Sequence, residues 1–255
     1  MILERRSLII EKIKQERMVK VAELIAQFGV SIETVRRDLE YLEKQGILKR
    51  VYGGAVIAGL YGEEPTYSHR EVINFEEKKA IGIKASQFID DGDTVFIDVG
   101  TTTREVAKNL LGKQNLTVIT NATLIAHELI KNESCRVILL GGELRKGELS
   151  VAGFLTDKCI EYFNANKLII GVGGITLSHG ITDYNIEEAN TRRMMIKRAD
   201  KIIAVADYSK FGVTAMNNVC ALRDVDTLVT DWSVSQKTIS EIKLSGINVA
   251  IAAQP

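Results

Sequence analysis

The 255-residue sequence has few cysteines and no long apolar run. Its three cysteines, Cys135, Cys159 and Cys220, are widely spaced and form no C-x-x-C pair. A disulfide framework or a zinc site is therefore not expected, whereas a reducing compartment is. No apolar run approaches the roughly 20 residues that a membrane span needs, and the Glu-Arg-Arg near the start does not fit a signal peptide. These absences predict a cytoplasmic protein with no membrane partner.

Histidine is also scarce, and the chain has no net charge. The three histidines, His69, His127 and His179, are scattered, so no metal site is expected and no cofactor is predicted. Basic and acidic side chains are unevenly distributed, because residues 1–58 carry 11 basic and 8 acidic side chains and the remainder is net negative. This mild asymmetry has the direction expected of an N-terminal part that binds nucleic acid.

Proline occurs only at Pro65 and Pro255. Pro65 lies in a segment rich in glycine and polar residues, which is typical of a domain linker. The chain is also long enough for two domains. The sequence therefore predicts an N-terminal domain over residues 1–57, a linker over 58–70 and a second domain over 71–255.

The N-terminal domain contains helical patterns over residues 3–16, 19–30 and 31–45. Gly29 suits the end of the second helix, and Ser31 suits the N-cap of the third. The third helix has an apolar stripe that is expected to face inward, formed by Ile32, Val35, Leu39 and Leu42. Two short strands follow and are joined at Tyr52-Gly53-Gly54. Two helices joined by a tight turn and followed by a hairpin predict a winged helix-turn-helix.

The outward face of the third helix carries residues that can contact DNA. Arginine pairs bidentately with guanine or binds a phosphate, and serine and threonine hydroxyls do either. The alternative is a solvated face on which the cations pair with Glu33 and Glu40. Asp38 is not expected to read bases, because phosphates repel an acid; it would orient an arginine or cap a neighbouring group. The candidate DNA-binding residues are Ser31, Thr34, Arg36, Arg37, Tyr41, Lys49, Arg50, Tyr52 and Gly53.

After residue 71 the pattern alternates between strands and helices. Strands are predicted over 94–98, 116–120, 136–140, 167–172, 201–207, 226–230 and 247–252. Helices are predicted near 73–89, 122–131, 186–199 and 235–244, with a further one after the Gly-Thr loop at residue 100. Strands separated by helices indicate an α/β fold with a mainly parallel sheet covered on both faces.

Several of these strands end in small or polar residues. In IDVGTTT, residues 97–103, an aspartate ends a strand and three threonines open a helix, whose amides attract anions. The threonines could instead only cap the helix. Loops at the carboxyl ends of parallel strands meet at one edge, where ligands bind, and Arg145 and Lys210 there could neutralise a phosphate. The candidate effector-binding residues are Asp98, Gly100, Thr101, Thr102, Thr103, Asn121, Gly142, Arg145, Gly174, Glu188 and Lys210.

These motifs together resemble the DeoR-type family of bacterial sugar-operon regulators over nearly the whole chain. In the N-terminal domain the resemblance rests on Ser31, Thr34-Val35-Arg36-Arg37-Asp38-Leu39, Leu42, Gly46 and Arg50-Val51-Tyr52-Gly53-Gly54-Ala55. In the second domain it rests on the Asp-x-Gly-Thr-Thr loop, Thr-Asn, Leu-x-Gly-Gly, Glu188-Ala189 and the stretch from Asp207 to Gly212. Three departures stand out: Tyr52 replaces a histidine of the family pattern, Gly173 replaces an aspartate, and Gly153-Phe154 stands where the family often has Gly-Pro.

The resemblance implies a transcriptional regulator, in most cases a repressor, that binds double-stranded operator DNA as a dimer or tetramer. It implies that the second domain shares the sheet architecture of pentose-phosphate isomerases and coenzyme A transferases and senses a phosphorylated sugar or a related metabolite.

An enzyme is the alternative, either an isomerase or a dinucleotide-binding protein. The isomerases that the second domain resembles carry two aspartates in Asp-Gly-Ala-Asp-Glu, and this chain has Ile170 and Gly173 at those positions. The Gly-Val-Gly-Gly of residues 171–174 does not open a helix, as a dinucleotide fingerprint should. No catalytic residues are therefore predicted.

Overall fold

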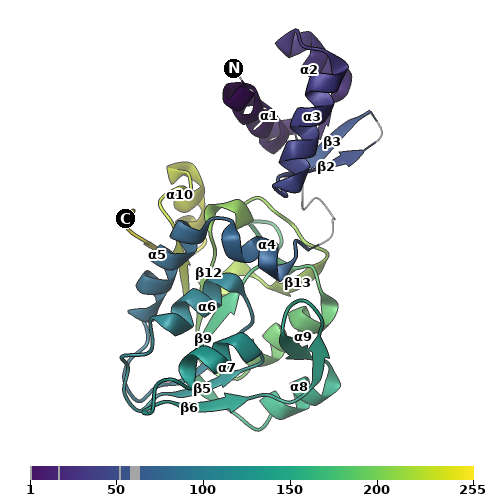
Figure 1. Cartoon of the computed structure of the whole chain (residues 1–255). Helices are drawn as coiled ribbons and strands as arrows, with labels where there is room; N and C mark the ends of the chain where they lie inside the picture. Colours follow the sequence, from purple (N-terminus) through teal and green to yellow (C-terminus); the bar gives the residue numbers. More distant parts are fainter. Residues whose placement is uncertain (1, 17, 52, 58–63) are drawn as a thin grey trace. The chain divides into compact units, whose positions relative to one another are not determined.

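The computed structural model describes residues 2–16, 18–51, 53–57 and 64–255. The chain forms two compact units, Met1–Pro65 and Thr66–Pro255, which are called the head and the body (Figure 1). Tyr52 and residues 58–63 of the predicted linker lie outside the described residues.

The head is built from three helices and a three-stranded antiparallel sheet. The elements are α1 (Ile2–Glu16), β1 (Met18–Lys20), α2 (Val21–Phe28), α3 (Ile32–Lys44), β2 (Leu48–Val51) and β3 (Gly54–Ile57). The sheet order is β1-β3-β2, so the predicted hairpin gains a third strand that the sequence pattern did not reveal. Apolar side chains of all three helices and of the sheet share one core. The winged helix-turn-helix prediction is confirmed.

The inward stripe of α3 differs from the prediction at one residue. Ser31 caps the helix, and its Oγ accepts a hydrogen bond from the Thr34 amide at 3.3 Å. Ile32 is 42% exposed, because the first residue of the helix lies beyond the core. Asp38 is instead buried, at 2% exposure, on the same side as Val35 and Leu39.

The body contains a seven-stranded sheet of order β15-β14-β12-β9-β4-β5-β6, in which every pairing is parallel. The predicted mainly parallel α/β fold is confirmed. The strands are β4 (Thr94–Ile97), β5 (Thr117–Thr120), β6 (Arg136–Leu139), β9 (Ala165–Gly171), β12 (Ala199–Val205), β14 (Thr227–Thr230) and β15 (Asn248–Ile251).

Helices cover both faces of this sheet (Figure 1). One face packs against α5 (Phe75–Ser86), α6 (Thr101–Lys108) and α7 (Thr123–Leu129), and the other against α8 (Phe154–Ile160), α9 (Ile186–Ile196) and α10 (Gln236–Leu244). Neighbouring residues of β9 alternate between the two cores: Leu168 and Ile170 face one, and Ile169 faces the other. A short helix, α4 (Tyr67–Val72), precedes α5 and begins inside the segment predicted as linker.

Short strands that the sequence pattern did not predict extend from the carboxyl ends of the main strands. Hairpin β7–β8 (Glu143–Arg145, Ser150–Ala152) follows β6, and hairpin β10–β11 (Gly174–Thr176, Gly180–Asp183) follows β9. Strand β13 (Asn217–Cys220) follows β12 and pairs with β11; turns η1 (Tyr208–Lys210) and η2 (Leu222–Asp224) flank β13. These insertions bring side chains to the edge where the parallel strands end.

The strand order reverses beside β4. The chain runs from β4 through β5 to β6 on one side, and then from β9 through β12 and β14 to β15 on the other. Ligands of open α/β sheets bind outside the carboxyl ends of the strands at such a switch point. Within the part of the chain that the structure describes, no helix has the length and apolar content to cross a bilayer.

Candidate functional site

The exposed face of α3 carries the side chains predicted to contact DNA. The Ser31 and Thr34 hydroxyls lie 3.0 Å apart at its start. Arg37 is exposed, and Arg36 is 61% exposed with Nη1 3.7 Å from Glu33. Tyr41 is half-exposed, and a guanidinium from α1, that of Arg6, lies over its ring. Polar and cationic groups are thus gathered along one side of the helix.

Two ion pairs along α3 agree with the alternative that its cations form a solvated face and pair with Glu33 and Glu40. Besides the Arg36–Glu33 pair, Lys44 Nζ lies 2.9 Å from Glu40. Such exposed pairs contribute about 0–1 kcal/mol, so they leave the cations able to exchange partners with phosphates.

The hairpin explains the consecutive glycines. Gly53 has φ of 79°, which a glycine adopts without strain. A Cβ on Gly54 would lie 2.2 Å from the Val19 carbonyl oxygen, because β3 packs tightly against β1. Arg50 on β2 is held by Glu43, with Nε 2.6 Å from the carboxylate. Tyr52 and the side chain of Lys49, both predicted to contact DNA, lie outside the described residues.

The loop after β4 presents free amides at the start of α6. The amide of Arg104 donates to the Gly100 carbonyl at 3.1 Å, which is the first bond of this helix. The amides of residues 100–103 therefore have no partner within the helix. Thr101 and Thr102 are largely buried beside them, and the Thr103 hydroxyl donates back to Gly100 at 3.0 Å. This geometry suits an anion. The N-cap is Gly100 and no side chain caps α6, so the alternative that the threonines only cap the helix is not supported.

Asn121 supports this loop from the end of β5. Its Oδ1 accepts from the Val99 amide at 3.1 Å, and its Nδ2 donates to the Val151 carbonyl at 3.4 Å. Asn121 is fully buried, so both ends of its amide join the loop to hairpin β7–β8. Asn121 therefore holds the loop after β4 in place.

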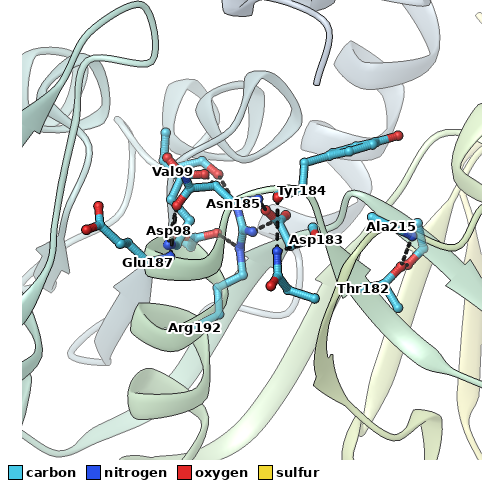
Figure 2. A network of polar contacts seen from close by, with 12 residues as sticks. Asp98, Val99, Thr182, Asp183, Tyr184, Asn185, Glu187, Arg192 and Ala215 are labelled. Atoms are coloured by element: carbon cyan, nitrogen blue, oxygen red, sulfur yellow. Dashed lines mark hydrogen bonds and ion pairs between the residues drawn. The ribbon is translucent and has the colours of Figure 1, made fainter. Parts of the chain in front are cut away.

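A buried guanidinium on α9 organises the switch point (Figure 2). Arg192 donates through Nε to Asp98 and through Nη1 to Asp183. Its Nη2 lies 3.9 Å from Glu188. All four side chains are buried. One cation thus meets three carboxylates, which come from the end of β4, the end of β11 and the first turn of α9.

The negative charge of the Asp98 carboxylate is not fully compensated in this cluster. Burial raises the pKa of its carboxyl to about 7, although Arg192 opposes the rise, and Glu188 and Asp183 add to it. Conversely, the pKa of Arg192 is held above its ordinary value, because the three carboxylates outweigh burial. The second oxygen of Asp98, Oδ1, is buried and has no hydrogen-bond partner. An acceptor in this state favours a ligand that supplies a donor.

Glu188 connects the cluster to hairpin β7–β8. Its Oε1 accepts from Ser150 Oγ at 2.9 Å and lies 2.8 Å from Arg145 Nη1. Asn185 fixes the start of α9 by accepting from the Glu188 amide at 3.0 Å. The predicted Glu188 and Arg145 are therefore in contact with each other.

Lys78 on α5 adds a further cation to this edge. Its buried ammonium donates to the carbonyls of Arg70 and Ile73, the latter at 2.5 Å. Burial lowers the pKa of Lys78 to about 8; Asp207 counteracts this, whereas the positive charge of Lys210 adds to it. The predicted Lys210 and the unpredicted Lys78 thus act on each other at the end of β12.

Two predicted glycines have packing roles. A Cβ on Gly142 would lie 2.0 Å from Thr156 Oγ1, and one on Gly174 would lie 2.3 Å from the Val213 carbonyl oxygen. Gly173, which departs from the family pattern, has no room for an aspartate either, since its Cβ would lie 2.9 Å from the Thr182 carbonyl oxygen. These glycines shape the edge of the sheet.

Asp183, Arg192 and Lys78 were missed by the sequence analysis. Arg192 lies four residues after Glu188, on the same side of a predicted helix, and this spacing was the available signal. No such signal in the sequence pointed to Asp183, because the hairpin that carries it was not predicted. Among the described residues, no group of histidine, cysteine and acidic side chains is arranged to hold a metal ion.

Both units match described protein families. Residues 5–59 match the DeoR-like helix-turn-helix domain, and residues 73–232 match the DeoR C terminal sensor domain. Similar curated proteins include the HTH-type transcriptional regulator GolR of Listeria innocua, 33% identical over 98% of both chains. The glycerol-3-phosphate regulon repressor of Escherichia coli is 36% identical over 89% of this chain and 90% of its own. The putative aga operon transcriptional repressor of Escherichia coli O157:H7 is 31% identical over 98% of this chain and 94% of its own.

Solved structures show a weaker similarity. Ribose 5-phosphate isomerase A from Neisseria gonorrhoeae is 16% identical, with a TM-score of 0.40 over 53% of each chain. Translation initiation factor eIF-2B from Pyrococcus horikoshii is 17% identical, with a TM-score of 0.43 over 88% of this chain and 81% of its own. At these scores the similarity supports no conclusion about activity.

Proposed function

The chain belongs to the DeoR family of transcriptional regulators, and on that premise we propose that it represses a sugar-catabolism operon and leaves its operator when a phosphorylated sugar binds the body. It is a DNA-binding regulator and not an enzyme. The relatives that span nearly its whole length are likewise named as transcriptional regulators or repressors. The glycerol-3-phosphate regulon repressor is one of them, and its name supports a phosphorylated effector for this chain.

The buried, unpartnered oxygen of Asp98 is the observation that carries the effector proposal. It lies at the switch point, in a cluster whose three carboxylates face two guanidiniums, those of Arg192 and of Arg145. Sugar hydroxyls supply donors without adding a buried charge, so a polyol satisfies this acceptor at low electrostatic cost. Asp98 and Glu188 are the proposed hydroxyl acceptors.

The phosphate would bind beside this cluster. The amides of residues 100–103, which have no partner within the helix, and the dipole of α6 attract an anion. Lys78, Arg145 and Lys210 supply positive charge at the same edge of the sheet. A phosphate near Lys78 would favour its charged form, whose pKa burial has lowered.

Operator contacts are proposed for the exposed face of α3 and for the hairpin. Ser31, Thr34, Arg36 and Arg37 would lie in the major groove, while Arg50 and the turn at Gly53 would approach the backbone. Each chain has one recognition helix, so specific binding would require a homodimer or homotetramer on repeated half-sites. Effector and operator would then weaken each other's binding by the same factor.

The test is fluorescence anisotropy on labelled duplexes from upstream of the protein's own gene and its neighbours. Salt-sensitive, sequence-preferring binding that one sugar phosphate reverses is the expected result. Asp98→Asn and Lys210→Met should keep operator affinity and lose the response to the effector. Lys158→Ala, which removes an exposed cation paired with Glu161, is the control and should behave as wild type.

Two outcomes would contradict different parts of the proposal. Specific DNA binding that no sugar phosphate reverses would reject the effector class and leave the regulator intact. A wild-type response in Asp98→Asn and Lys210→Met would move the effector away from the carboxyl edge of the sheet.

A further inference from the structure

The N-terminal helix of the head contributes two arginines that share one buried carboxylate. Arg5 Nε lies 2.6 Å from Asp38 Oδ2, and Arg6 Nε lies 2.8 Å from Asp38 Oδ1. Asp38 lies on α3, more than 30 residues away along the chain. Two guanidiniums and one carboxylate leave this cluster with a surplus positive charge.

Among the described residues, two other arginines of the head each have a single acidic partner. Arg36 pairs with Glu33, and Arg50 pairs with Glu43. If Arg5 and Arg6 served only to join α1 to α3, one arginine would neutralise Asp38 and the second would add an uncompensated charge to a partly buried site. The surplus cation therefore indicates a further anion.

Arg6 lies next to the face of α3 that is proposed to read DNA. Its guanidinium carbon is 3.8 Å from the centre of the Tyr41 ring, a cation–π contact. Tyr41 lies four residues after Arg37, on the same side of the helix, and is 43% exposed. The stacked guanidinium thus extends the cationic face of α3 onto α1.

Both arginines keep donors for another partner. A guanidinium has five N–H groups, and Asp38 occupies the Nε donor of each. Their side chains are 14% and 21% exposed, so part of each guanidinium reaches the surface. With Nε bound to Asp38, the Nη groups are the ones that remain for a ligand.

We infer that Arg5 and Arg6 form a DNA-phosphate contact on the flank of α3, with Asp38 and Tyr41 as the residues that position them. A helix in the major groove has the phosphate backbones along both of its flanks, and arginine forms charge-assisted bonds with phosphate oxygens. This contact is independent of base sequence, and it extends the DNA interface beyond the helix-turn-helix and the wing.

The salt dependence of binding tests the contact in the full-length protein. Each phosphate contact that is lost lowers the slope of log Kobs against log salt by about 1. Arg6→Met should reduce the slope by about one on operator and unrelated DNA alike and weaken both about tenfold near 0.15 M salt, leaving their ratio unchanged. Arg6→Lys should retain the slope, because it keeps the charge, and Lys158→Ala is the control. Arg37→Ala should instead reduce the ratio of the affinity for operator DNA to the affinity for unrelated DNA.

A second pair of variants separates DNA contact from stability, since Arg6→Met alone leaves Asp38 with one partner. Asp38→Asn and Asp38→Asn/Arg6→Met both lack the buried carboxylate, and they differ only in the second cation. The double variant should again show a slope about one unit lower than the single variant. Equal slopes in this pair, with a change only in the melting temperature of the head, would mean that the arginines only join α1 to α3.

Discussion

The head and the body each bury a cluster of charges, and the two clusters have opposite composition. In the head, one carboxylate lies between the guanidiniums of Arg5 and Arg6. In the body, the guanidinium of Arg192 lies among three carboxylates, and only one of these, Glu188, has a second guanidinium beside it, that of Arg145. The surplus is positive where a DNA phosphate is proposed to bind and negative where sugar hydroxyls are proposed to bind. A chain with no net charge thus contains two sites of opposite sign, each suited to its own ligand.

Removal of the central cation should break the body cluster. Arg192→Ala leaves three carboxylates buried without their shared partner, and breaking a buried pair costs about 3–5 kcal/mol. Calorimetry of the full-length protein should show the unfolding transition of the body shifted down by that amount. Lys158→Ala should change its stability by less than about 0.5 kcal/mol. A comparable loss in both variants would mean that the cluster adds nothing to stability.

The pH dependence of stability should show that the body cluster carries surplus negative charge. The pKa of Asp98 is raised to about 7 in the folded protein and is near 3.9 in the unfolded chain. The folded state therefore holds the extra proton between about pH 4 and 7, and the stability that Asp98 contributes is lost as the pH rises through this window. Relative to wild type, Asp98→Asn should gain on the order of 2–4 kcal/mol between pH 4 and 8.

Chemical denaturation of both proteins across that range measures this difference. If the free energies of unfolding of the two proteins differ by the same amount at every pH, then Arg192 fully compensates the charge of Asp98. The cluster would then have no surplus negative charge for a ligand to meet.

The head cluster should tolerate loss of its central charge better. Asp38→Ala leaves two partly exposed guanidiniums, which water reaches, so a cost of about 1–3 kcal/mol is expected. Hydrogen exchange of the α3 amides in the full-length protein measures it. Glu43→Ala, which removes the partly exposed partner of Arg50, is the matched control and should cost about 0–1 kcal/mol of stability. If Asp38→Ala costs as much as Arg192→Ala, the contrast between the two clusters fails.

The smallest expected effect is a proton taken up with the effector. Lys78 has a pKa of about 8 in the protein without ligand, so about half of it is neutral at pH 8. A bound phosphate would raise this pKa and draw in up to about half a proton. Calorimetric titrations in buffers of different ionisation enthalpy detect the uptake, and Lys78→Arg, which stays charged, should abolish it. Uptake that persists in Lys78→Arg would assign the proton to another group.

Local patterns were sufficient to predict the framework. The helix-turn-helix, the hairpin and the parallel strands follow from periodicity and from glycine positions within a few residues of one another. The strand-end loop that starts at Asp98 was predicted for the same reason, because a strand, a glycine and a helix start are contiguous in the sequence.

Contacts between distant segments account for what was missed. Asp183 reaches the site on a hairpin whose pairing with β13 depends on residues about 35 positions later. The partners of Arg192 are set by where β4 and β11 end, not by its neighbours in α9. Ile32 was wrongly assigned to the core because periodicity does not show where a core stops along a helix. The predicted DNA and effector contacts stay predictions until the variants are measured.

The position of β3 has a consequence for the entropy of operator binding. Gly54 packs against the Val19 carbonyl, and β3 lies between β1 and β2, so the wing is part of a three-stranded sheet and not an isolated hairpin. An isolated two-stranded hairpin is marginally stable and would lose conformational freedom when it met DNA. In this head the backbone of β2 and β3 is ordered when the protein folds. Association with the operator then imposes a smaller ordering cost on the wing, and the contacts that it makes contribute more fully to affinity.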